Sequence, residues 1–368
     1  MEVKKIYNCR AVNGLKAVIV MVATQIAYAV MNILYKLAVV DGMDFRILVA
    51  YRLLFASAVM LPVALFFEWK SWEKLDWVIL FQAFLCGLLG GSLSLNLYIE
   101  GLALTTVTYV VALSNLIPAI TFVLAICFRL EKLAVKTKAG MVKVGGTVLG
   151  ICGAMIFTFY RGTEIDVLST PVDLLPHQHF HVASKQTHVG MHLLGSFLAF
   201  TSSLSYALWL IVQTKMSKRY PFYYSSTALM CIVGLIQSLA FALCMERDWN
   251  KWKLGWNIRL LTVTFSGIVT SGVVTTMIAW CVHKRGPLFV AIFNPLGLVM
   301  VGIAGSLFLE EKLHLGSLIG GLLIVCGLYM VLWGKAKEMK RTQLEPSQGP
   351  QETQIQSTED VPTASFEK

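Results

Sequence analysis

The sequence predicts an all-helical integral membrane protein in which ten transmembrane helices form two inverted five-helix repeats. Composition is the first observation: 56% of the 368 residues are hydrophobic and only 14% are charged, with a mean hydropathy of +0.67. A soluble domain carries about 25% charged residues, so lipid must surround most of this chain. The second observation is a series of long apolar runs. The third is a charged phrase that occurs twice, as "LEKL" and again as "LEEKL".

Ten apolar runs are long enough to cross the roughly 30 Å hydrocarbon core of a bilayer as helices. The N-terminus has basic residues but no signal-peptide cleavage site, so the first run is expected to remain as a helix. In chain order, the runs lie at 15–38, 45–67, 77–99, 104–128, 139–159, 191–213, 223–244, 259–281, 287–309 and 313–333. The expected organisation is a cytoplasmic N-tail (1–14), a first five-helix repeat (15–159), a His-rich outer loop (160–190), a second five-helix repeat (191–334) and a disordered C-tail (335–368).

The duplicated phrase predicts the internal repeat. Aligning Glu131 with Glu311 also brings Gly140 onto Gly320, and a shift of two residues brings Tyr28 onto Tyr206. These aligned residues fall on equivalent helices, which indicates an internal duplication of one five-helix unit. Because five is odd, the second unit must enter the membrane from the opposite face, and the repeats are therefore inverted.

Basic residues are distributed unevenly between the predicted loops. With the N-terminus in the cytoplasm, the inner segments carry roughly twice as many Lys and Arg as the outer ones, as the positive-inside rule requires. Both termini are therefore expected in the cytoplasm, although the loop after the seventh helix, with Arg247, Lys251, Lys253 and Arg259, runs against this trend. The net charge of +10 thus follows membrane topology, and no nucleic acid is expected as a partner.

Polar and aromatic side chains recur at helical spacing within several predicted spans. On the first helix they fall on one face, which should turn toward the protein interior or a water-filled cavity, because lipid offers no hydrogen-bond partners. As alternatives, the polar groups could join helices by hydrogen bonds, and the aromatic rings could pack in the core or anchor the interface. The candidates to line a cavity are Gln25, Tyr28 and Asn32 on the first helix, Asn96 and Tyr98 on the third, Tyr206, Trp209 and Gln213 on the sixth, and Thr276 and Trp280 on the eighth.

Two prolines interrupt otherwise continuous apolar helices. Pro118 in the fourth helix and Pro295 in the ninth each remove a backbone donor and free a carbonyl of the preceding turn. Asn115 and Asn294 stand close by, so each break could contribute to a binding site between the repeats. The alternative is a static kink fixed by packing.

Three charged residues, Lys36, Arg52 and Glu100, are predicted toward the outer side of the membrane interior. A charge in a spanning helix is costly unless it is paired or hydrated. We expect Lys36 or Arg52 to attract a carboxylate, with Glu100 as the competing internal partner. Snorkelling of the long basic side chains to the interface is the alternative.

The predicted outer loop contains a histidine-rich stretch, "PHQHFHVASKQTHVGMH". His177, His179 and His181 are weak candidates for a metal site, and a membrane-embedded metalloenzyme is the rival class that they suggest. A solvated loop segment fits them better, because few further histidines lie elsewhere in the chain and the eight cysteines show no metal-binding spacing. We therefore expect no cofactor.

Several segments together carry a family resemblance. They include "QIAYAVMNILYK" at 25–36, "NLYIEGLALTTVT" at 96–108, "NLIPAITFVLAICFRLEKL" at 115–133 and "RGPLFVAIFNPL" at 285–296. Up to about residue 340, the chain resembles the plant Walls-Are-Thin-like (nodulin-21-type, EamA-domain) transporters of the drug/metabolite transporter superfamily, also called the "usually multiple acids move in and out" family. Ser94 and Leu95, and Asn294 before Pro295, depart from the pattern of many relatives, so no single substrate is carried over.

The resemblance implies a secondary carrier that moves amino acids, auxin or related small metabolites, and not an enzyme. Its partners would be the small-molecule substrate and the lipid bilayer. Inverted repeats supply a physical basis, because two such halves can expose a site between them to either side in turn. A channel or a receptor is the remaining alternative. The resemblance favours the plasma membrane over the vacuolar membrane. Closely spaced glycines of the fifth and tenth helices suggest tight packing or a homodimer contact.

Overall fold

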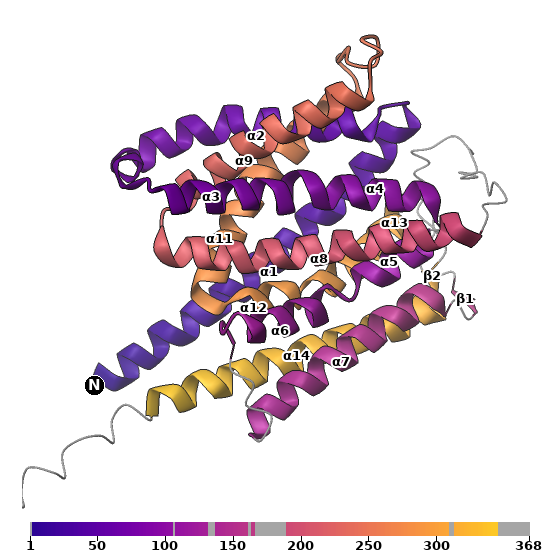
Figure 1. Cartoon of the computed structure of the whole chain (residues 1–368). Coiled ribbons are helices and arrows are strands. Elements are labelled where there is room, and N and C mark those ends of the chain that lie inside the picture. The colour runs from indigo at the N-terminus through magenta and orange to yellow at the C-terminus, as the bar shows by residue number, and fades with distance from the viewer. Residues whose placement is uncertain are drawn as a thin grey trace, which may run out of the picture.

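The computed structural model describes residues 2–105, 107–131, 137–160, 163–165, 189–308 and 313–344. Figure 1 shows a bundle of helices in which α1 begins and α14 ends at the same end. We call this the N-terminal end of the bundle. The helices are α1 (Glu2–Val40), α2 (Phe45–Phe67), α3 (Trp77–Cys86), α4 (Ser94–Leu104), α5 (Val107–Ser114), α6 (Ile117–Cys127), α7 (Lys138–Phe159), α8 (Val189–Arg219), α9 (Tyr223–Met245), α10 (Ile258–Phe265), α11 (Thr275–Arg285), α12 (Pro287–Ala291), α13 (Asn294–Phe308) and α14 (Leu315–Leu344).

The membrane-spanning helices match the predicted fold class. Among the described residues, nine helical segments are long and apolar enough to cross a membrane, and Pro287–Ile303 is a shorter apolar tenth. The helices continue into both predicted tails, because α1 begins at Glu2 and α14 ends at Leu344. The segment that extends α14, "KAKEMKRTQL", is rich in residues of high helix propensity. The remainder of the predicted C-tail, 345–368, lies outside the described residues.

Short elements complete the chain. The connection between α2 and α3 contains a 3₁₀ helix, η1 (Trp69–Lys74). Strands β1 (Glu164–Ile165) and β2 (Leu313–His314) pair antiparallel, with Glu164 opposite His314. They tie the segment after α7 to the start of α14, at the end of the bundle opposite the N-terminal end.

Two π-helical segments stand at equivalent places in the two repeats. Segment η2 (Gly87–Leu93) connects α3 to α4, and η3 (Ser266–Val274) connects α10 to α11. A Cβ at Gly87 would lie 2.9 Å from the Gly234 nitrogen, and one at Gly267 would lie 2.6 Å from the Arg52 carbonyl oxygen. Glycine therefore permits η2 to approach α9 and η3 to approach α2. This paired arrangement agrees with a duplicated unit, and π segments are frequent at functional sites.

Helices α7 and α14 form a tightly packed pair, side by side along the lower edge of the view (Figure 1). A Cβ at Gly146 would lie 2.8 Å from the Gly327 carbonyl oxygen, and one at Gly320 would lie 2.6 Å from the Phe157 nitrogen. The small residues thus bring the two backbones together. The predicted glycine pattern is used for packing between the repeats of one chain.

The fourth and ninth spans are each divided into two helices. Helix α5 ends at Ser114 and α6 begins at Ile117, directly before Pro118, while α12 ends at Ala291 and α13 begins directly before Pro295. Both prolines are buried and line one cavity of about 10 Å³, together with residues of α7 and α14. The two breaks therefore lie close together inside the bundle.

Candidate functional site

Helix α1 turns the predicted polar face toward the interior. Ile19, Ile26 and Val30 are exposed and mark its lipid-facing side. Successive helical residues are about 100° apart, which places Asn32 roughly 140° from the centre of that side. The Asn32 side chain is nevertheless exposed, and its amide donates to the Tyr28 carbonyl at 2.8 Å. An exposed residue on the inner side of a spanning helix indicates space that water can reach.

Three of the predicted residues meet next to this face. Tyr28 of α1, Tyr206 of α8 and Asn294 of α13 are all half-buried. The Tyr206 phenol lies close to both the Tyr28 phenol and the Asn294 side chain. The first and second repeats thus contribute polar groups to one place, with the break before Pro295 supplying Asn294.

Arg52 of α2 lies beside the two tyrosines. Its Nε donates to Ser271 Oγ at 2.5 Å, and one terminal nitrogen donates to the Tyr35 hydroxyl at 3.0 Å. Over the described residues, no carboxylate oxygen lies within 4.0 Å of this guanidinium. Glu100, the expected competitor, instead pairs with Arg46. Within the described part of the chain, Arg52 therefore holds its positive charge inside the membrane span with neutral partners only.

Sequence reasoning missed two of these partners. Tyr35 lies seven residues after Tyr28, on the same helical face, and this spacing could have identified it. Ser271 belongs to η3, and no pattern in the sequence connects it to α2. We call Tyr28, Tyr35, Arg52, Tyr206, Ser271 and Asn294 the Arg52 site.

The other predicted residues lie elsewhere and mainly join helices. Gln213 donates to Ser226 of α9 at 3.2 Å, and Asn115 donates to Thr158 of α7 at 3.3 Å. The Asn96 amide donates to the Ser92 carbonyl at 2.8 Å, one turn earlier in the third span. The bonds of Gln213 and Asn115 correspond to the helix-joining alternative, whereas the Asn96 bond lies within a single span.

The remaining candidates have packing roles or different surroundings. Trp209 is buried, with its ring against Gly90 of η2, and Gln25 is buried against Gly297 of α13. Tyr98 is half-buried on α4, and none of the described contacts links it to the Arg52 site. Thr276 and Trp280 line a separate cavity between α1 and α9.

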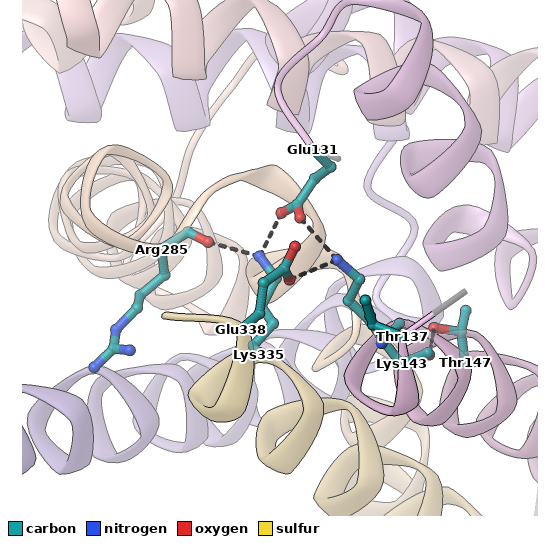
Figure 2. Close-up of polar contacts among 8 residues, drawn as sticks. Glu131, Thr137, Lys143, Thr147, Arg285, Lys335 and Glu338 are labelled. Carbon is teal, nitrogen blue, oxygen red and sulfur yellow. Dashed lines mark hydrogen bonds and ion pairs between the residues drawn. The ribbon is translucent and has the colours of Figure 1, made fainter. Parts of the chain in front are cut away.

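A buried ionic cluster joins α7 and α14 to the segment just after α6, toward the N-terminal end of the bundle (Figure 2). Glu131, just after α6, accepts from Lys335 of α14 at 2.5 Å and from Lys143 of α7 at 3.3 Å. Lys143 also pairs with Glu338 at 2.8 Å, and Lys335 donates to the Arg285 carbonyl at 2.8 Å. We call Glu131, Lys143, Lys335 and Glu338 the Glu131 cluster. The duplicated motif identified Glu131 as a position that aligns between the repeats, but it did not predict the ion pairs of Glu131 with Lys335 and Lys143.

The Glu131 cluster is well shielded from solvent. The side chains of Glu131, Lys143 and Lys335 are 9%, 2% and 9% exposed. Burial alone would raise the pKa of the Glu131 carboxyl, but the charges and hydrogen bonds of Lys335 and Lys143 outweigh it and hold the pKa below its ordinary value. Glu131 therefore stays ionised and connects α6 to the α7–α14 pair.

The histidine candidates for a metal cannot be located in the fold. His177, His179 and His181 lie outside the described residues. Within the described part of the chain, no group of three or more His, Cys, Asp or Glu side chains is arranged to hold a metal ion.

Comparisons with known proteins agree with this architecture. The EamA-like transporter family model matches residues 15–159 and 193–333. A WAT1-related protein of Arabidopsis thaliana is 45% identical over 326 residues, covering 89% of this chain and 91% of the relative. A second WAT1-related protein of Arabidopsis thaliana is 44% identical over 326 residues, which again cover 89% of this chain and 91% of the relative. A solved crystal structure with 14% identity has a TM-score of 0.65 and covers 86% of this chain and 96% of its own, which supports the fold. The chain belongs to the EamA-like transporter family, whose plant members include the WAT1-related proteins.

Proposed function

We propose that this multi-pass membrane transporter moves small carboxylate-bearing metabolites, such as amino acids or auxin-like acids, by alternating access. The observation that carries the proposal is Arg52, a cation inside the bundle with no carboxylate within 4.0 Å in the described residues. A buried charge normally has a counter-ion, and a guanidinium binds carboxylates through paired hydrogen bonds. A substrate carboxylate would supply the missing partner.

The neighbouring groups suit the rest of a small metabolite. Tyr28, Tyr206 and Asn294 offer hydroxyl and amide groups that can donate to or accept from an amino group or a second polar substituent. The two phenol rings also present flat apolar surfaces. An aromatic acid and an amino acid therefore both fit the chemistry of the Arg52 site.

The two ends of the bundle suggest the direction of access. Exposed Asn32 lies on the inner side of α1, in its second half, whereas the Glu131 cluster joins α7 and α14 to the segment just after α6, toward the N-terminal end. We infer that the Arg52 site faces the end opposite the N-terminal end in this conformation. Transport would then require the Glu131 cluster to separate so that the site faces the N-terminal end.

The proposal includes an orientation in which the N-terminal end of the bundle lies in the cytoplasm. The uneven distribution of basic residues supports that orientation, with both termini on the cytoplasmic side. The family resemblance favours the plasma membrane, with the vacuolar membrane as the alternative. The conformation described here would then be open to the outside or to the vacuolar lumen.

Counterflow in proteoliposomes tests the proposal. Full-length protein, preloaded inside with an unlabelled compound, is given labelled neutral amino acids, acidic amino acids and auxin. We expect accumulation of one labelled carboxylate class, and a loss of at least about tenfold with Arg52→Gln because a charge-assisted contact is removed. Arg46→Gln is the matched control, because it also removes a cation from α2. The partner of Arg46, Glu100, is half-exposed.

Two results would oppose the proposal. Unchanged counterflow in folded Arg52→Gln protein would show that Arg52 does not bind the substrate. Flux of labelled carboxylates without counterflow or saturation would indicate a channel instead of a carrier.

A further inference from the structure

A cavity of about 450 Å³ lies between the first half of α1 and the start of α9. Lys16 and Ile19 of α1, Tyr224 of α9, and Thr276, Met277 and Trp280 of α11 are among its lining residues. The volume falls within the range of about 300–1,000 Å³ that is usual for small-ligand cavities. The cavity is near the N-terminal end, because α1 and α9 begin there and α11 ends there.

The cavity opens toward the membrane. Ile19 is 58% exposed and lies on the lipid-facing side of α1 together with Ile26 and Val30. At the back of the cavity, Thr276 donates to Thr227 Oγ1 at 3.1 Å and so joins α11 to α9. The walls therefore form a lateral groove, which is separate from the Arg52 site.

The groove combines apolar walls with a cation, Lys16, at its N-terminal end. Ile19, Met277 and the Trp280 ring provide the apolar part, and Lys16 is exposed where α1 approaches the end of the bundle.

Two of the nearby carboxylates, Glu68 and Asp76, already have partners. Glu68 accepts from the Ser225 backbone N–H at 2.8 Å, and Asp76 pairs with Arg219 at 2.6 Å. A further acid, the exposed Glu73, adjoins the exposed Lys74 in η1. Lys16 thus brings positive charge to the mouth of the groove.

We propose that this groove binds one anionic phospholipid of the leaflet at the N-terminal end. The acyl chain would lie against Ile19, Met277 and Trp280, and the phosphate would contact Lys16. Basic residues at the membrane surface attract anionic headgroups, and tyrosine and tryptophan favour the same interfacial depth. A soluble metabolite fits less well, because the groove opens to lipid along the exposed side of α1.

Fluorescence quenching by brominated lipid tests this site. Full-length protein is reconstituted in phosphatidylcholine vesicles that contain increasing fractions of phosphatidylserine or phosphatidylcholine brominated in the acyl chains. The Trp280 signal is the difference between the wild-type protein and Trp280→Phe. We expect brominated phosphatidylserine to quench half of this signal at a mole fraction about fivefold lower than brominated phosphatidylcholine requires.

Variants separate headgroup recognition from general lipid contact. Lys16→Gln should bring the ratio between the two lipids toward one, whereas Lys16→Arg should preserve it. Lys215→Gln, at an exposed lysine of α8 near the same end, should leave the ratio unchanged. Val20→Phe, which narrows the groove, should reduce Trp280 quenching by both lipids.

The proposal fails if wild-type Trp280 shows no quenching, or equal quenching by the two lipids. It also fails if Lys16→Gln and Lys215→Gln change the ratio equally, since that would reflect the total charge of this end. Each variant is compared after it elutes as a single species with an unchanged melting temperature.

Discussion

The two ends of the helix bundle hold their charges in different ways. At the N-terminal end, Glu131, Lys143 and Lys335 are almost completely buried and connect α6, α7 and α14. At the opposite end, the Arg259–Asp41 pair has side chains that are 25% and 42% exposed. Exposed ion pairs contribute about 0–1 kcal/mol, whereas a buried pair that loses one partner leaves an unpaired charge and costs about 3–5 kcal/mol. The comparison therefore identifies the Glu131 cluster as the stronger of these two contacts.

The largest expected effect comes from Glu131→Gln. The change leaves Lys335 and Lys143 buried without the carboxylate between them, so we expect closure of the N-terminal end to weaken by about 3–5 kcal/mol. Cys281, buried on α11 four residues before Arg285, should then react faster with a maleimide, as measured by mass spectrometry of the labelled peptide. An unchanged labelling rate, in protein with an intact fold, would show that the Glu131 cluster does not hold this end closed.

A second change should restore part of this loss. In Glu131→Gln/Lys335→Met, the buried amino group that lacks a carboxylate is removed as well, so about 1–3 kcal/mol should be recovered. The measurement is the melting temperature together with Cys281 labelling. Lys337→Met removes an exposed lysine of the same helix and provides the matched control. Equal recovery with both lysine changes would attribute the effect to overall charge.

Lowering the pH should weaken the Glu131 cluster only below about pH 5. Because the pKa of Glu131 is lowered in the folded protein, its stabilising contribution is present above the unfolded value of about 4.3 and is lost as the pH falls through the lowered folded value. The difference in melting temperature between wild type and Glu131→Gln should therefore stay constant from neutral pH to about pH 5. A difference that already declines between pH 7 and 6 would contradict an ionised, paired Glu131.

The smallest effect is expected from Arg259→Gln at the opposite end. This side chain bonds Asp41 through Nε at 2.6 Å, but the pair is partly exposed. Its loss should change stability by about 1 kcal/mol or less, and the remaining difference should shrink further in high salt. A loss as large as that from Glu131→Gln would remove the distinction between the two ends.

Much of the fold could be predicted from the sequence because bilayer thickness and hydrophobicity constrain it directly. The apolar runs located the spanning segments, and the echo of Glu131 in Glu311 indicated the repeat. The π-helical segments were not predicted, because the sequence does not show which helix each of them packs against. The glycines of these segments are explained only by the close approach of α9 and α2 in the folded chain.

The site was harder to predict because the rotation of each helix depends on its neighbours. Tyr28, Arg52, Tyr206 and Asn294 were all proposed from their sequence patterns, and the structure brings them together. Trp280 shared the same kind of pattern but turns into the lateral groove. Polar spacing thus identifies an inner face of one helix, but not which other helix it meets.

The most direct test of the proposed function pairs a change in the substrate with a change in the protein. Once counterflow has identified a transported carboxylate, its uptake is compared with that of its primary amide in wild type and in Arg52→Gln. If Arg52 binds the carboxylate, wild type should prefer the acid by about 10–100-fold, and Arg52→Gln should lose most of that preference. An undiminished preference in the folded variant would show that another group recognises the carboxylate and would contradict the central claim.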